Sequence, residues 1–357
     1  MDLNLINQKL QAARYSVDIF GVLNSDDIEN KLKELKGLFN LMAKNTHEDL
    51  FGNTDDKKIA HEAFIKLTEW HERAIKDLEA GNYGKKEQIK IKTKKGVIII
   101  HDIFHSGGIA DIFNCTKEGD TKKDLVLKLV RDSANCDLAN NEINVLKQLF
   151  THTGEYLRII TNHTIGPLEI FEIDKKPAIL FEKLNGFYSL QDVINQYKTG
   201  IDPKNIAWIF RRMLGILGAI HGLGLVHGNV IPSNFLICPE NHNGKLIDFT
   251  NTVKIGQKAK FINGDHLYFY PPEMRDKREL TPASDIYMAA KCMLELLGNV
   301  GNVPEKILNF LHACTIDNPH RRLNNSLDIH RDFGDTIDKI WTREFHKFEM
   351  PNPANKQ

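Results

Sequence analysis

The chain has 357 residues, of which 41% are apolar and 26% are charged. This balance is typical of a soluble globular protein with a sizeable core, and it excludes disorder over most of the length. Basic and acidic residues both number 47, so the formal net charge is zero, which argues against a dominant nucleic-acid surface. No run of about 18 apolar residues occurs, so the sequence predicts no segment that spans a membrane.

The cysteine pattern bears on the redox environment. The five cysteines are scattered, odd in number, and form no CxxC pair. They predict reduced thiols in a cytoplasmic protein. The sequence also lacks the paired Cys and His spacing of a zinc site.

Residues 1–84 are predicted to form a helical segment. Apolar residues recur at steps of three and four from Ile28 to Met42 and again from Ile59 to Leu78. A polar loop separates the two stretches, so we expect two amphipathic helices packed as an antiparallel hairpin. In the Lys-rich stretch that follows, the apolar period changes to two. This change predicts a β-hairpin that turns at residues 94–96, and a domain boundary near residue 84.

The rest of the chain changes from strand-rich to helix-rich. Strands are expected over residues 109–115, 125–130, 168–173 and 178–181, with one helix over residues 139–150. After about residue 188 the pattern is mostly helical. We therefore predict an α+β fold with a helical segment at 1–84, a β-rich small lobe at 85–184, an α-rich large lobe at 185–345 and a tail at 346–357.

One group of motifs falls in the β-rich region. Residues 105–113 contain the pair Gly107-Gly108, and glycines let backbone amides come close to phosphate oxygens. Lys128 lies on an expected apolar strand, and Glu142 lies on the expected helix behind it. Residues 179–184, Ile-Leu-Phe-Glu-Lys-Leu, read as the end of a buried strand.

A second group falls in the α-rich region. Residues 226–236 read Val-His-Gly-Asn-Val-Ile-Pro-Ser-Asn-Phe-Leu, and residues 247–250 read Ile-Asp-Phe-Thr. Residues 271–273, 284–287 and 318–322 follow. In this order the motifs resemble those of the protein kinase family over roughly residues 97 to 340. They are similar to its Gly-rich loop, VAIK strand, αC helix, hinge, HRDLKPEN catalytic loop, DFG and APE motifs, αF helix and late arginine motif.

The resemblance implies a bilobal fold that binds ATP and Mg²⁺. Lys128 would pair with Glu142 and hold the α- and β-phosphates, while Asn234 and Asp248 would bind the metal. Glu273 would pair with Arg322. The nucleotide-binding residues implied by the match are Gly107, Gly108, Ile112, Val126, Lys128, Glu142, Glu182, Leu184 and Leu236.

Four departures from the family pattern bear on function. Asn229 stands at the position of the catalytic aspartate, and an amide cannot accept the substrate proton as a carboxylate does. Ile231 replaces the lysine that steadies the γ-phosphate. Gly228 replaces the arginine that commonly reads a phosphorylated activation loop, and Val126 replaces a small alanine beside adenine. We therefore expect an ATP-binding pseudokinase with little phosphotransfer, acting as a regulatory or docking module.

Two alternatives stay open. One is an active atypical serine/threonine kinase, or a kinase-fold transferase of another group such as AMP, in which Asp248 and the metal carry catalysis and Asn229 orients the acceptor. The other is an interaction or co-chaperone protein that binds no nucleotide. Loss of a general base typically costs about 10²–10⁴-fold in rate, which predicts a severe defect without proving inactivity.

The helical segment carries a second resemblance. Residues 47–49 read His-Glu-Asp in the loop between the two expected helices. Over residues 16–82 the segment resembles a J-domain, which stimulates DnaK-type chaperones through a His-Pro-Asp motif in that loop. Here Glu48 stands in place of the proline. The resemblance implies a DnaK-type chaperone as one partner; no nucleic-acid or membrane partner is expected, and any other protein partner is unknown.

Overall fold

The computed structural model describes residues 3–13, 15–25, 27–52, 54–84, 89–342 and 346–350. The chain forms two compact units, residues 1–88 and residues 89–357, and each is described by itself. Lys85 and Lys86 of the Lys-rich stretch lie outside the described residues, as does the predicted tail beyond residue 350. Over the described part of the chain, no helix is both long and apolar enough to cross a membrane.

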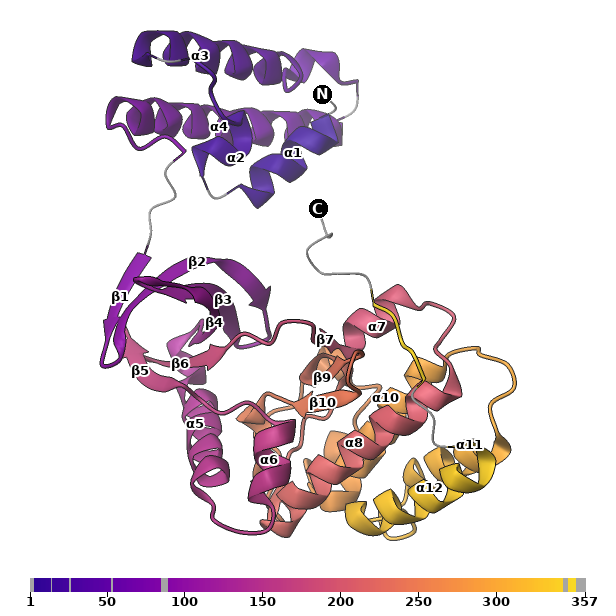
Figure 1. Cartoon of the computed structure of the whole chain (residues 1–357). Coiled ribbons are helices and arrows are strands. Elements are labelled where there is room, and N and C mark those ends of the chain that lie inside the picture. Colours follow the sequence, from indigo (N-terminus) through magenta and orange to yellow (C-terminus); the bar gives the residue numbers. More distant parts are fainter. Residues whose placement is uncertain are drawn as a thin grey trace. The chain divides into compact units, whose positions relative to one another are not determined.

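The first unit is helical, as predicted. Its elements are α1 (Leu3–Ala12), α2 (Ser16–Phe20), α3 (Ile28–Lys44), the short 3-10 turn η1 (Glu48–Leu50) and α4 (Thr54–Glu79). The helices α3 and α4 lie side by side as the expected hairpin (Figure 1). Both α1 and α2 pack on α4, and neither was predicted as a separate element. In the loop between α3 and α4, His47 Nδ1 lies 3.4 Å from Asp49 Oδ2, and both side chains are exposed.

In the second unit, six described strands form one sheet in the order β1-β2-β3-β4-β6-β5. Each strand pairs antiparallel with its neighbours, and β1 and β2 form the predicted hairpin, with Thr93 opposite Gly96. The sheet supports α5 (Cys136–Thr151), and together they form the predicted small lobe. The strands are β1 (Ile89–Thr93), β2 (Gly96–Ser106), β3 (Ala110–Lys117), β4 (Asp120–Val130), β5 (Glu169–Ile173) and β6 (Lys176–Glu182).

The two ends of this sheet meet, so the sheet curls around its own core (Figure 1). Thr93 Oγ1 on β1 donates to Glu169 Oε2 on β5 at 2.8 Å, and the Lys94 N–H donates to Glu169 Oε1 at 2.9 Å. A carboxylate that joins two edge strands satisfies polar groups that would otherwise invite pairing with another chain. The enclosed side chains include Ile98, Cys115, Leu127 and Leu180, among others.

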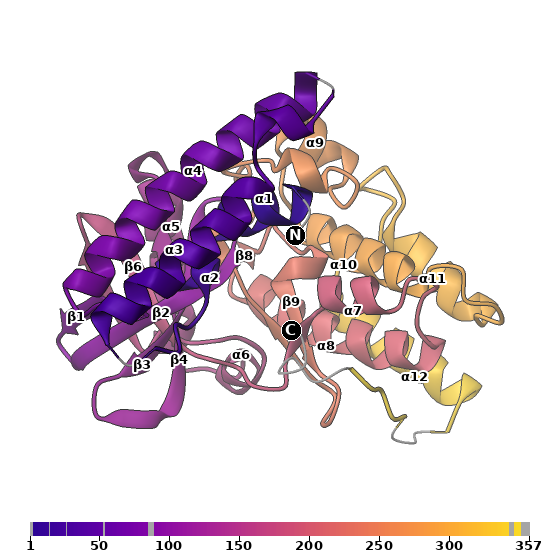
Figure 2. The same ribbon diagram turned by 90° about the horizontal axis from the view of Figure 1, so that it is seen from above.

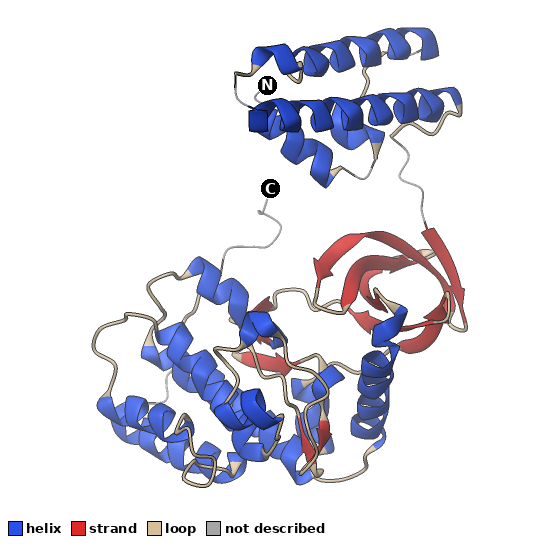
Figure 3. Ribbon diagram, turned by 180° about the vertical axis from the view of Figure 1, so that it is seen from behind, coloured by secondary structure: helices blue, strands red, loops and turns tan. Residues whose placement is uncertain are grey.

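The large lobe is mostly helical, and Figure 3 shows the contrast between its blue helices and the red strands of the small lobe. Its centre is α8 (Pro203–Gly222), which packs against α10 (Pro282–Leu297) and α12 (Ser326–Ile340) (Figure 2). The other elements are α6 (Leu157–His163), β7 (Tyr188–Ser189), α7 (Leu190–Gln196), β8 (Leu225–Val226), η3 (Pro232–Asn234), β9 (Phe235–Cys238), β10 (Asn243–Leu246), η4 (Phe249–Asn251), β11 (Val253–Lys254), η5 (Gly264–His266), α9 (Pro272–Lys277) and α11 (Glu305–Cys314).

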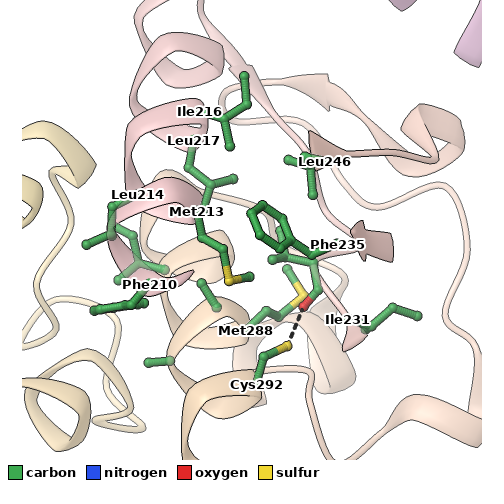
Figure 4. Packing of buried hydrophobic residues seen from close by; sticks show 14 of the residues in the cluster. Phe210, Met213, Leu214, Ile216, Leu217, Ile231, Phe235, Leu246, Met288 and Cys292 are labelled. Atoms are coloured by element: carbon green, nitrogen blue, oxygen red, sulfur yellow. Dashed lines mark hydrogen bonds between the residues drawn. The ribbon is translucent and has the colours of Figure 1, made fainter. Parts of the chain in front are cut away.

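The core of the large lobe forms because α8 is apolar on nearly every face. Figure 4 shows Met213 of α8 directed toward Met288 of α10 and Phe235 of β9, and the Phe210 ring of α8 packs edge-on against Phe333 of α12. The thiol of Cys292 on α10 donates to the carbonyl oxygen of Val230 at 3.6 Å. The segment 226–236 is thereby held directly against the core.

A buried ion pair joins α9 to the segment between α11 and α12. Arg322 Nη1 lies 2.7 Å from Glu273 Oε1, as the sequence predicted, and both side chains are almost completely buried. Arg322 also donates to the carbonyl oxygens of Ala283, Ile316 and Asp317. The guanidinium therefore has a partner for each of its buried N–H faces, which a buried charge requires.

We expect Arg322→Met to destabilise the second unit by about 3–5 kcal/mol, because the change leaves Glu273 buried without its counter-charge. Lys90→Met is the matched control, since Lys90 pairs with Glu118 at 2.7 Å on the surface. That exposed pair contributes about 1 kcal/mol or less. Urea unfolding of the two variants measures the difference, and equal losses of stability would contradict the assignment.

Candidate functional site

Three predicted residues meet where the two lobes join. Lys128 Nζ on β4 lies 2.6 Å from Glu142 Oε2 on α5 and 2.8 Å from Asp248 Oδ1 in the large lobe. Glu142 is buried, while 23% of the Asp248 side chain is exposed. Because β4 alternates, Val126 and Lys128 face the opposite way from the fully buried Leu127. The sheet therefore directs Lys128 at both carboxylates.

The charged groups of this cluster shift one another's pKa values. Burial alone would raise the pKa of Asp248, but the charge and hydrogen bond of Lys128 lower it below its ordinary value. Burial would lower the pKa of Lys128, and the two carboxylates raise it instead. Burial raises the pKa of Glu142 despite the ammonium beside it. At neutral pH Lys128 is therefore a cation and Asp248 an anion, as phosphate and metal binding require.

Asp285 on α10 fixes the catalytic-loop segment, residues 226–236. Asp285 is fully buried on α10 and accepts from the backbone N–H groups of His227 at 2.7 Å and Gly228 at 2.8 Å. His221 Nε2 lies 2.9 Å from the same carboxylate. Three polar groups thus satisfy one buried charge, which explains why an aspartate can occupy the core here.

Asp248 adopts a left-handed backbone conformation, with φ 65° and ψ 75°. The residues around it hold this turn. The N–H of Phe249 donates to Glu142 Oε1 at 3.3 Å, and the Phe249 ring packs edge-on against His227 at 4.9 Å. Asn141 Nδ2 donates to the carbonyl oxygens of Thr250 and Thr252 at 3.1 and 2.9 Å. The helix α5 therefore fixes the segment after Asp248 as well as Lys128.

Asn229 takes part in a network of amides around Asp248. Its Nδ2 donates to Asp248 Oδ2 at 2.9 Å, and its Oδ1 accepts from the Tyr270 hydroxyl at 3.1 Å. Asn234 Nδ2 donates to the Asn229 carbonyl oxygen at 3.0 Å and lies 3.3 Å from Asp248 Oδ2. The structure thus brings the predicted metal residues Asn234 and Asp248 together beside the altered catalytic position.

Ile231 has no polar side-chain group to add to this network. It is only 3% exposed and belongs to the core of the large lobe (Figure 4). The sequence identified Ile231 as the replacement of a γ-phosphate lysine, and the structure adds that the residue now contributes to packing.

The Gly-rich loop is a closed turn between β2 and β3. The Gly107 N–H donates to the Ala110 carbonyl oxygen at 2.9 Å. Arg131 Nη2 donates to the Gly107 carbonyl oxygen at 2.8 Å and pairs with Asp111 at 2.9 Å. Ala110 lines a cavity beside Lys128 of about 10 Å³, roughly the room that one water molecule needs. Lys128 and Glu142 also line this cavity, so it belongs to the same site, although at this volume it does not itself accommodate a nucleotide.

The remaining predicted nucleotide residues lie on the same strands or at their ends. Ile112 on β3 is opposite Lys128, and Val126 on β4 is opposite Phe181 on β6. Glu182 ends β6 and is exposed, and Leu184 follows it half-buried. Leu236 is half-buried on β9 between two buried neighbours. It therefore faces away from the core of the large lobe.

Comparison with known families bears on the identity of this site. Residues 101–316, more than half of the chain, match the protein kinase domain. The chain belongs to the protein kinase family. A crystal structure of a kinase domain superposes with a TM-score of 0.53 at 14% sequence identity, covering 67% of this chain and 95% of that domain. The kinase fold predicted from the sequence, with its small β-rich and large α-rich lobes, is confirmed.

Two relatives illustrate how far the similarity extends. An inactive leucine-rich repeat receptor-like serine/threonine-protein kinase of Arabidopsis thaliana is 26% identical over 224 residues, which cover 60% of this chain and 33% of the relative. Serine/threonine-protein kinase F of Synechocystis sp. is 27% identical over 169 residues, or 43% of this chain and 32% of the relative. The chain thus spans about a third of the length of these relatives. The match to the kinase domain does not include residues 16–82, whose J-domain resemblance stays a prediction.

Two contact residues were missed by sequence reasoning. Tyr270 directly precedes the APE-like motif, and no local pattern indicated its contact with Asn229. Asn141 directly precedes Glu142, so its place on α5 was predicted, but its bonds to Thr250 and Thr252 depend on contacts across more than a hundred residues.

Gly228 permits the turn of the catalytic loop. Its φ is +73°, and a Cβ there would lie 2.7 Å from Leu280 Cδ1 and 2.9 Å from the Asn251 carbonyl oxygen. We expect Gly228→Ala to cost more than about 2 kcal/mol, since strain and a clash with backbone add. Gly256→Ala is the control, because Gly256 has φ +86° and nothing within 4 Å. It should cost about 1 kcal/mol. Chemical denaturation compares them, and equal costs would refute the argument.

Proposed function

We propose that this protein is a nucleotide-binding pseudokinase: it binds ATP between its lobes, transfers little phosphate, and serves as a regulatory or docking module. The observation that carries the proposal is the cluster of Lys128, Glu142 and Asp248, with both carboxylates within 2.8 Å of the ammonium. A kinase-fold protein without nucleotide binding has no need to keep a cation and two carboxylates in contact. The cluster therefore argues against an interaction protein that binds no nucleotide.

Asp248 and Asn234 are residues of a kind that binds Mg²⁺, but these two side chains alone do not complete its coordination shell. Asp248 supplies a carboxylate and Asn234 an amide oxygen, both of which are hard oxygen ligands. Within the described residues, no group of three or more His, Cys, Asp or Glu side chains could hold a metal ion alone. Phosphate oxygens would have to complete the shell, as they commonly do for Mg²⁺. A bound metal would neutralise phosphate charge, and Lys128 would bind phosphate oxygens directly.

Little transfer is expected because two groups that act on the acceptor are absent. Asn229 presents an N–H to Asp248 and has no basic oxygen for a substrate proton. Two residues after Asn229, Ile231 is buried in the core and offers no cation to the γ-phosphate. The Arabidopsis relative, named an inactive kinase, is in line with this proposal.

Binding of Mg·ATP should stabilise the native protein. At a ligand concentration of 100 times the dissociation constant, the gain is about 2.7 kcal/mol, so the melting temperature rises with ATP concentration. Asp248→Asn keeps the side-chain size but removes the charge that holds Lys128. We expect it to weaken ATP binding by at least about tenfold.

The control for that variant is Asp332→Asn, which removes an equal charge from an exposed site on α12. It should leave ATP binding unchanged. A folded wild-type protein that shows no stabilisation at millimolar Mg·ATP would refute nucleotide binding. An Asp248→Asn variant that binds ATP like the wild type would show that the site is misassigned.

Restoring the missing groups should raise phosphate transfer. Asn229→Asp supplies the base, and Ile231→Lys supplies a cation whose long stem can lie where the isoleucine packs. Together they should increase autophosphorylation by about 10²-fold or more, measured with labelled ATP. Asn324→Asp, which adds the same charge at an exposed loop position, is the control.

Two results would count against this prediction. Wild-type protein that already transfers phosphate at ordinary kinase rates, roughly 1–100 per second, would reject the pseudokinase proposal. A double variant that binds ATP and still transfers nothing would show that the base and the cation are not what limits transfer. A parallel assay with ATP labelled in the α-phosphate tests the alternative of AMP transfer.

A further inference from the structure

Tyr270 lies beside the altered catalytic position and has no part in the function proposed above. Its side chain is fully buried, and its hydroxyl lies 3.1 Å from Asn229 Oδ1. Burial raises the pKa of Tyr270 to about 12, so the hydroxyl keeps its proton at neutral pH. A buried hydroxyl next to a catalytic position fixes the hydrogen bonding of whatever stands there.

The direction of each hydrogen bond follows from the groups themselves. A carboxamide oxygen can only accept, so the Tyr270 hydroxyl is the donor to Asn229. With its oxygen held in this way, Asn229 has to direct its N–H group at Asp248 Oδ2, 2.9 Å away. Turning the amide over would place Asn229 Oδ1 against the carboxylate of Asp248, which can only accept, and would break that bond.

This chain of bonds completes the coordination of Asp248 by N–H and O–H donors. Oδ1 accepts from Lys128 at 2.8 Å and from the Thr250 hydroxyl at 3.1 Å. Oδ2 accepts from Asn229 at 2.9 Å and from Asn234 at 3.3 Å. A carboxylate has about four lone-pair sites, so a metal ion can bind Asp248 only by displacing one of these donors.

We propose that Tyr270 is a positioning residue that holds the Asn229 amide on Asp248 in place of a metal ion, so that ATP binding depends little on Mg²⁺. This inference rests on the nucleotide binding proposed above and adds the form of nucleotide that the site accepts. The fixed N–H of Asn229 and the ammonium of Lys128 offset the charge of Asp248 without a metal. Free ATP and Mg·ATP should then bind with similar affinity.

The test is the dissociation constant of ATP for the full-length protein, measured in Mg²⁺ and again in EDTA. For the wild type we expect the two values to differ by less than about threefold, since the donors already satisfy Asp248. Tyr270→Phe keeps the ring and removes only the hydroxyl, which frees Asn229 to turn its oxygen outward. The difference should then grow to at least about tenfold.

Tyr268→Phe is the matched control, because Tyr268 lies two residues away in the same segment and is 56% exposed. Its Mg²⁺ dependence should equal that of the wild type. A second variant, Asn229→Asp, places two carboxylates in contact and should also make binding Mg²⁺-dependent, whether or not Tyr270 is present.

Three results would overturn the proposal: a wild-type difference of tenfold or more, an equal difference in wild type and Tyr270→Phe, or an Asn229→Asp variant that binds equally in both buffers. If the wild type binds no ATP in either buffer, the proposed function itself is wrong, and this inference falls with it. The two failures are therefore distinguishable in one experiment.

Discussion

The carboxylate of Asp248 is the point at which the two lobes depend on each other. A charge that is largely removed from water is costly unless other groups satisfy it, and no single element here does so. The small lobe supplies Lys128, and the large lobe supplies the amides of Asn229 and Asn234. Glu142 holds Lys128 from the other side. Loss of any one partner leaves the others with unsatisfied charge, so the site acts as a unit.

A second carboxylate holds the same loop from the large-lobe side. Asp285 is fully buried and binds the backbone of His227 and Gly228, whereas Asp248 binds the side chains that follow. The loop is therefore fixed at both ends of a stretch of only a few residues. This arrangement keeps the scaffold of the kinase fold around Asn229 and Ile231, which stand where the family pattern has an aspartate and a lysine. The lysine and the two carboxylates of the family pattern, Lys128, Glu142 and Asp248, are kept in contact.

Much of this was predictable from the sequence because the signals are local. The change of the apolar period to two predicted the hairpin of β1 and β2, and the spacing of three and four predicted α3 and α4. Lys128, Glu142, Asn234 and Asp248 could be matched to a family because each lies in a short motif of fixed order. The pairing of Arg322 with Glu273 followed from the same order and is present in the structure.

The contacts that the sequence did not predict are those made between distant segments. Glu169 closes the curled sheet by binding Thr93, and nothing in the period of either strand indicates that the two edges meet. Tyr270 and Asn229 are far apart in sequence, and neither residue alone shows that the hydroxyl fixes the amide. Ile231 reads as a lost lysine, and only the packing of the large lobe shows that it now fills the core. Tertiary contacts, rather than local propensity, decide all three.

The central claim is that ATP is bound and not consumed, and one measurement tests it most directly. Purified full-length protein is incubated with equimolar ATP labelled in both the adenine and the γ-phosphate. The protein is then separated rapidly from free nucleotide, and the bound nucleotide is identified by chromatography. The account predicts about one nucleotide per chain, recovered as intact ATP after hours of incubation. Recovery of ADP with label on the protein, or of no nucleotide at all, would contradict it.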